Sequence, residues 1–410
     1  MAARFIRFTP LLLGLIALAG PFYATAHEPI TTKVRFNKEV IRILQRNCLG
    51  CHRPEGVAMS LATYDDARPW AKAIKEEILE RRMPPWHAVK GYGDFLNAPS
   101  LTQREMDLIV NWVEGGAPRG DDKDLPPGPL YSDDWGLGKP DLVLEPERDF
   151  KVASDSDERR VFLLPSNLKE SRWLSAVDLR PGNRSVVHCA TIYLEASQAP
   201  PAGKAAGRVG PESAVLGVWM PGQKTVAYPK GVARFLRAGS RIRLEIHYRG
   251  AGEDTKDRSQ VGLYFATAPP GRQMGEIALN DPGAEIPAGD GLHRVSQAVT
   301  ISEDAEAVAI RPGVHPLLVS LQASAQRPDG TEEVLIWARG YQFDWRPTYY
   351  FRRPVALPKG TRIEVIAHFD NSESNRDNPS SPPVKARWSD LSSDALCAVV
   401  ISTNRAGSDR

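Results

Sequence analysis

The chain has 410 residues, of which 42% are hydrophobic and 25% charged, so its composition is that of a globular protein. At this length two or three domains are expected rather than one core. The formal net charge is only +2 and no Lys/Arg block stands out, which argues against nucleic acid as a main partner. The cysteines are Cys48, Cys51, Cys189 and Cys397. Two share one motif, so at most one disulfide can form elsewhere, and a disulfide-stapled fold is excluded.

Residues 1–26 have the form of a secretory signal peptide. Basic residues near Met1 precede an apolar run at Leu11–Ala19, and Ala24 and Ala26 frame a cleavage site. The alternative is an uncleaved membrane anchor, but this apolar run is short for a segment that spans a membrane. We therefore expect a periplasmic or secreted protein with no transmembrane segment in the mature chain.

Residues 27–122 show helical spacing of apolar side chains. Helices are expected over residues 36–44, 70–79 and 102–114. The second is expected to stop before Pro84-Pro85. The third opens on a capping box formed by Thr102 and Glu105. This pattern predicts an α-helical domain.

The pattern changes after residue 122. Residues 123–139 are charged and rich in proline and glycine, which indicates a linker. Beyond them, short β-rich runs alternate with turns, for example Ser185–Tyr193, Arg241–Tyr248, Val334–Arg339 and Arg362–Phe369. About 270 residues suit two sandwich domains better than one. We place them at 140–281 and 282–410.

The sequence Cys48-Leu49-Gly50-Cys51-His52 is a C-x-x-C-H motif. In such a motif the two thiols form thioethers with the haem vinyl groups, and the histidine binds the iron. A zinc or thioredoxin-like site would need partner ligands or a βαβ pattern, and the sequence has neither. The motif therefore predicts covalently bound haem c with His52 as an axial ligand.

The sixth iron ligand is predicted to be Met83. It lies at an expected helix end, where Pro84 and Pro85 stiffen the loop and would hold a thioether against the haem. Met59 and His87 are the alternatives.

The chain resembles a known bacterial arrangement, a cytochrome c domain fused to a copper type II, ascorbate-dependent monooxygenase-like module. That module is related to the peptidylglycine α-hydroxylating and dopamine β-monooxygenases. The matching motifs of the first part are Met59-Ser60-Leu61, Ala67–Trp70 and Arg82–Trp86. Those of the second part are Gly138–Asp141, Arg180–His188, Glu245–Tyr248 and Ala367–Ser372. The resemblance implies a multidomain fold: an α-helical cytochrome c domain at 27–122, followed by two all-β jelly-roll sandwich domains that each bind copper.

Only three of the six copper ligands that the resemblance implies are present. At the first copper, a His-His pair corresponds to His188-Cys189 and the third ligand to His247. At the second copper, a His-x-His pair falls on Gly313 and His315, and a late Met falls on Asp394-Ala395-Leu396. One imidazole does not hold copper tightly, so His315 is interpreted as structural. Cys189 is either a thiolate ligand beside His188 and His247 or a core residue.

We therefore expect haem-based one-electron transfer to or from a redox partner protein or a small reductant. The degenerate copper-monooxygenase-like module would serve as a docking or binding scaffold. One alternative is an active copper monooxygenase that receives electrons from its own haem. Another is a periplasmic copper-binding protein that uses His188 and His247. Whether the chain is an enzyme stays open.

Overall fold

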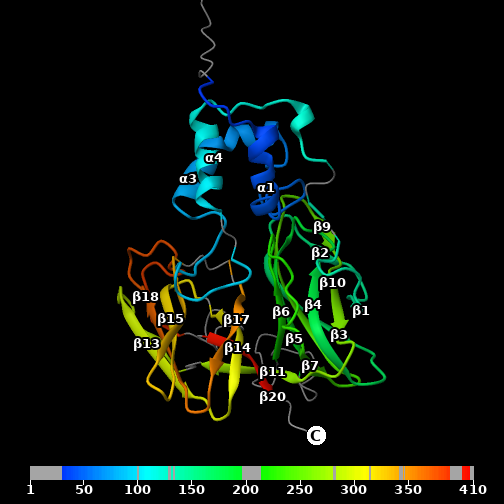
Figure 1. Ribbon diagram of the computed structural model, residues 1–410, viewed down its shortest axis with the longest axis vertical. Helices are drawn as coiled ribbons and strands as arrows, with labels where there is room; N and C mark the ends of the chain where they lie inside the picture. Colours follow the sequence, from blue (N-terminus) through cyan, green and yellow to red (C-terminus); the bar gives the residue numbers. More distant parts are fainter. Residues whose placement is uncertain are drawn as a thin grey trace, which may run out of the picture.

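The computed structural model describes residues 30–98, 101–127, 131–132, 134–195, 214–279, 283–313, 315–340, 345, 347–387 and 399–406. The predicted signal peptide, Cys397 and the 394–396 stretch lie outside these ranges. Figure 1 shows short helices above two β-rich halves that lie side by side.

The N-terminal segment, residues 30–127, holds short helices around one small core. They are η1 Phe36–Val40 (a π-helix), α1 Ile41–Asn47, α2 Tyr64–Ala67, η2 Arg68–Trp70, α3 Ala71–Leu79, α4 Gln103–Glu114 and η3 Asp122–Asp124, where η2 and η3 are 3₁₀. The predicted capping box is confirmed: Glu105 N–H donates to Thr102 Oγ1 at 3.2 Å, and Thr102 N–H donates to Glu105 Oε2 at 2.8 Å. The fully buried Trp112 packs on Phe36 with ring centroids 5.8 Å apart.

The predicted fold class, an α-helical cytochrome c domain followed by two all-β jelly-roll sandwich domains, is wrong. The protein is mostly β, with 40% strand and 13% helix, and no large α-helical domain is present in the described ranges. The physical reason is that helical spacing is sustained for only two or three turns at a time; α4, the longest helix described, has 12 residues. None of the described helices has the length and apolar character needed to cross a membrane.

The first sandwich consists of two facing four-stranded sheets, ordered β1-β10-β4-β7 and β3-β8-β5-β6. Its strands are β1 Leu142–Leu144, β3 Asp157–Pro165, β4 Arg172–Arg180, β5 Val187–Leu194, β6 Ala214–Trp219, β7 Val232–Leu236, β8 Arg241–Arg249 and β10 Gln260–Phe265; β2 Phe150–Val152 and β9 Thr255–Asp257 form a separate pair. Alternate side chains of both sheets fill one core, among them Leu174, Ile192, Ile246 and Leu263.

The second sandwich repeats this arrangement, with sheets ordered β11-β20-β14-β17 and β13-β18-β15-β16. Its strands are β11 Arg272–Leu279, β13 His293–Thr300, β14 Ala305–Pro312, β15 Leu318–Gln326, β16 Glu332–Arg339, β17 Tyr349–Leu357, β18 Arg362–Phe369 and β20 Val399–Ala406; β12 Glu285–Ile286 and β19 Ala386–Arg387 form a separate pair. The strands expected near 185–193, 241–248, 334–339 and 362–369 are confirmed as β5, β8, β16 and β18.

The two sandwiches share one continuous sheet rather than standing apart. Strand β7 pairs in parallel with β11, at Val232–Arg272 and Ala233–Gln273, and this joins four strands of each sandwich into eight. An ion pair between Arg234 and Glu276, at 3.0 Å, crosses the same junction. Strand β11 precedes the expected division at residue 281, yet it pairs with β20 of the second sandwich.

One part of the N-terminal segment belongs structurally to the second sandwich. In residues 86–97, Val89 N–H donates to Trp337 O at 2.7 Å and Leu96 N–H donates to Tyr350 O at 2.7 Å. The side chain of Phe95 is buried in the second sandwich core. A segment that sequence spacing assigns to a helical domain is therefore an irregular stretch that contacts strands β16 and β17 through two isolated bridges, Ala88–Ala338 and Phe95–Phe351.

Candidate functional site

The C-x-x-C-H motif forms a compact turn at the end of α1. Cys48 is the residue at which the helix ends, and Cys51 N–H and His52 N–H donate to Cys48 O at 3.1 and 2.9 Å. Leu49 is fully buried in the core of the N-terminal segment. The turn thus fixes two thiols and one imidazole on a short piece of backbone.

Both thiols of the motif are neutral at physiological pH. Burial raises the pKa of Cys48 to about 12, with a further contribution from Cys51, and burial raises the pKa of Cys51 to about 11. In this environment burial disfavours the thiolate form of both side chains.

The imidazole of His52 is held as an iron ligand would be. Its Nδ1 lies 3.1 Å from Met59 O, and because a carbonyl only accepts, Nδ1 carries the proton and Nε2 keeps its lone pair. Burial lowers the pKa of His52, an effect that the bond to Met59 partly offsets, and the neutral form is the ligating one.

Large apolar side chains are also exposed to solvent in the residues that follow the motif. Between residues 57 and 83, the side chains of Val57, Met59, Trp70, Leu79 and Met83 are 37% to 55% exposed. A haem is a large apolar group that buries such side chains when it is bound. The donor set and these exposed apolar side chains therefore fit a haem attached at Cys48 and Cys51.

The three candidate sixth ligands have different environments. Met83 N–H donates to Glu77 O at 3.2 Å, which places Met83 at the C-terminal end of α3, and Ile74 and Ile78 of α3 share the core that holds Leu49. Met83 and Met59 are both exposed, whereas His87 is only 5% exposed. The backbone of His87 accepts a bond from Arg339 N–H of β16, so this residue belongs to the second sandwich.

The burial of His87 gives a pH-dependent stability. Burial lowers its pKa from 6.5 to about 4, so as the pH falls the unfolded chain takes up the proton first. The contribution of the buried, neutral His87 imidazole to the free energy of unfolding is complete above pH 6.5. This contribution is lost as the pH falls from 6.5 to about 4. Between pH 7 and 5 we expect wild type to lose about 2 kcal/mol more unfolding free energy than His87→Gln, measured by denaturant titration. Equal losses in both proteins would contradict this assignment.

The motif packs directly against the first sandwich, a contact that no sequence pattern predicted. Cys51 Sγ–H donates to Pro221 O at 3.2 Å, in the loop between β6 and β7. A Cβ atom on Gly50 would lie 2.4 Å from Gly222 Cα, so only glycine permits this approach. The sequence feature that could have indicated this contact is the pair Pro221-Gly222, which predicts a turn.

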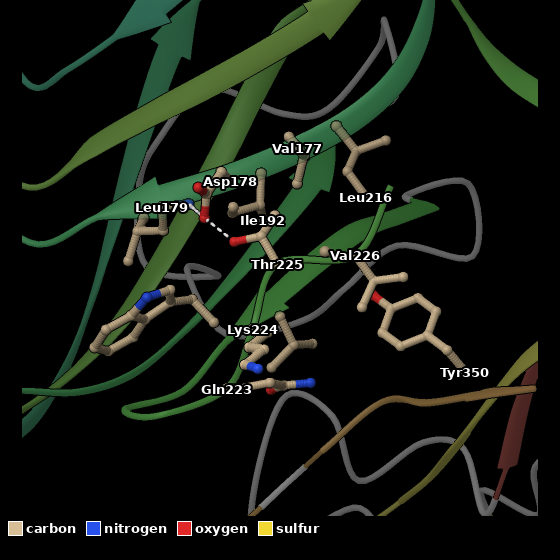
Figure 2. Close-up of a pocket in the computed structure, with 13 residues that line it drawn as sticks. Val177, Asp178, Leu179, Ile192, Leu216, Gln223, Lys224, Thr225, Val226 and Tyr350 are labelled. Carbon is tan, nitrogen blue, oxygen red and sulfur yellow. Dashed lines mark hydrogen bonds between the residues drawn. The ribbon is translucent and has the colours of Figure 1, made fainter. Parts of the chain in front are cut away.

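A buried carboxylate fastens that loop to the sandwich. Asp178 of β4 is 6% exposed and accepts bonds from Thr225 Oγ1 at 2.6 Å, Gly136 N–H at 2.9 Å and Leu179 N–H at 2.8 Å. Figure 2 shows the Asp178–Thr225 bond beside Gln223 and Lys224 of the same loop. Gly136 lies in the stretch expected to be a linker, so that stretch is tied to the same carboxylate.

The structure brings His188 and His247 together, as the sequence pairing anticipated. Their ring centroids are 5.3 Å apart. Val187 pairs with Tyr248 and Cys189 with His247, so His188 is the extra residue of a β-bulge. Cross-strand partners point to the same face, so Cys189 shares a face with His247 instead of entering the core with Tyr248.

Asp157 orients the second of these histidines. His247 Nε2 lies 2.5 Å from Asp157 Oδ1, which leaves Nδ1 as the nitrogen available to a metal. Burial lowers the pKa of His247, and the hydrogen bond from His247 lowers the pKa of Asp157. In the described ranges, however, no three His, Cys, Asp or Glu side chains form a group arranged to hold a metal ion.

His315 lies apart from this pair, in the second sandwich. It is 1% exposed, its Nδ1 accepts a bond from Leu317 N–H at 3.1 Å, and its ring packs edge-on against Phe369 at 5.8 Å. These contacts are those of a packed core histidine. Of the other positions expected at the second copper, Gly313 is described, while Val314 and 394–396 lie outside the described ranges.

No protein-family model and no curated protein sequence matches the chain. A solved structure of allantoicase is 8% identical, covers 54% of this chain and 81% of its own, and gives a TM-score of 0.17. The VP2 subviral particle of infectious bursal disease virus is 9% identical, with coverages of 65% and 76% and a TM-score of 0.18. Similarities this low carry no argument about fold or function.

Proposed function

We propose that the protein is an exported c-type haem protein that transfers single electrons. The observation that carries this proposal is the motif turn, in which two partly buried thiols lie beside an imidazole whose Nδ1 is bonded to Met59 O. A bound haem would supply one-electron exchange at its iron. Cys48 and Cys51 would hold it, and His52 and Met83 would be its axial ligands.

The two β-sandwiches serve this site as a docking and binding scaffold. The contact of Cys51 with Pro221 supports docking of the motif on the first sandwich. Between the sandwiches lies a cavity of about 190 Å³, whose lining includes Tyr228, Met274 and Tyr350. An apolar cavity of about 150 Å³ is enough to hold benzene, so a small, mainly apolar molecule fits here.

Reductive titration of the purified exported protein, followed through its haem absorption, tests electron transfer. We expect one electron per chain and re-oxidation by an added acceptor. A chain that carries no haem, or whose haem does not change oxidation state, would rule the proposal out.

Copper binding at His188 and His247 is the second candidate function, favoured by the 5.3 Å separation of the two rings. Cys189 shares a face with His247 but, in the described residues, does not form a three-ligand group with the two imidazoles, so copper would be held through two nitrogen ligands. We expect His188→Ala to weaken copper binding at least about 100-fold without changing the haem spectrum, measured by calorimetric titration. His293→Ala, which alters a histidine bonded to Asp290 in the second sandwich, is the control. If both variants bind copper as wild type does, the pair is structural.

A further inference from the structure

Trp86 connects the candidate haem ligand Met83 to the second sandwich. Its ring meets Tyr349 of β17 edge-on, with centroids 4.6 Å apart, and Phe95 at 6.0 Å. The side chain packs against the second sandwich core, in which Tyr349 is fully buried. The position of Trp86 is therefore set by the sandwich and not by the helices.

The link from Trp86 back to Met83 is short and stiff. Only Pro84 and Pro85 intervene, and the proline ring fixes φ at each of them. On its other side Met83 is bonded to Glu77 O at the end of α3. Met83 is thus held at α3 on one side and joined to Trp86, and so to the second sandwich, on the other. We expect a displacement of Trp86 to move Met83 as well.

The other side of the candidate haem site rests on the first sandwich. Cys51 contacts Pro221, and Gly50 contacts Gly222, both through the β6–β7 loop. The motif that would hold the haem therefore contacts the first sandwich, whereas Met83 is linked through Trp86 to the second.

We propose that Trp86 is a positioning residue that holds Met83 in place as the sixth haem ligand, so that the second sandwich controls iron ligation. This inference rests on the proposed haem function. Loosening Trp86 should increase the fraction of molecules in which Met83 has left the iron, without affecting attachment at Cys48 and Cys51.

The test uses the full haem-loaded protein and the variants Trp86→Leu, Trp86→Phe and Tyr92→Leu. Tyr92 is the matched control because it also packs on the second sandwich, edge-on to Trp337 at 5.0 Å, but lies farther from Met83 in the chain. The readouts are the far-red absorption band of methionine-ligated ferric haem, the midpoint potential, and the affinity for imidazole, which must displace the sixth ligand.

We expect Trp86→Leu to lose the far-red band, to show a lower potential, and to bind imidazole at least about tenfold more tightly. Trp86→Phe should fall between it and wild type, and Tyr92→Leu should resemble wild type. A wild-type band and affinity in Trp86→Leu would overturn the inference. If that variant does not fold, an unchanged Trp86→Phe would overturn it equally.

Two results separate this inference from the proposed function. A wild-type protein without covalent haem refutes the proposed function. A haem-loaded Met83→Ala variant that keeps the far-red band refutes only the role of Trp86, because Met83 is then not the ligand.

Discussion

The double variant Cys48→Ser/Cys51→Ser is expected to carry no covalently bound haem after export, while wild type carries one per chain. A thioether needs a sulfur at each position, and a serine hydroxyl does not form that bond. Intact-mass analysis of the denatured, acid-extracted protein measures the difference directly. The loss should be essentially complete, because no other described pair of thiols lies beside a histidine in one turn.

Cys189→Ser is the matched control for this experiment. Cys189 lies on β5 opposite His247 and outside the motif, so its replacement should leave the haem content unchanged. Haem that stays bound to the double variant through denaturation would contradict the assignment of both cysteines.

Asp178→Ala is expected to lower the free energy of unfolding of the first sandwich by about 3 kcal/mol. The substitution leaves Thr225, Gly136 and Leu179 without the acceptor that the buried carboxylate provides. It also frees the β6–β7 loop whose Pro221 contacts Cys51. Denaturant titration followed by circular dichroism gives the stability, and limited proteolysis reports whether the loop between β6 and β7 opens.

Asp178→Asn provides the comparison, because its amide keeps one oxygen acceptor of similar shape. It should lose less stability than Asp178→Ala and should protect the loop better. If alanine and asparagine have the same small effect, the carboxylate does not anchor the loop.

Short-range features of this protein were predictable from sequence. The capping box at Thr102 and Glu105 and the strands β5, β8, β16 and β18 follow from local patterns, whereas the approach of His188 to His247 was implied only by the family resemblance. Each of the local features depends on side-chain spacing within one strand or helix.

Features that depend on distant contacts were not predictable. The segment around Trp86 and Phe95 pairs with β16 and β17, about 250 residues later, and no spacing rule reveals that choice. The β-bulge at His188, which turns Cys189 to the face of His247, depends on the register of β8. The helices predicted at 36–44, 70–79 and 102–114 are present, but in the described residues they do not build a large helical domain, because each is short and residues 86–97 contact the second sandwich instead.

The mass of the denatured wild-type chain, exported and extracted with acid to remove loosely bound haem, shows whether haem is covalently attached. We expect the mass of the processed polypeptide plus one haem, with the added mass on the peptide that contains Cys48 and Cys51. A chain with the polypeptide mass alone, produced in cells that attach haem to other exported proteins, would contradict it.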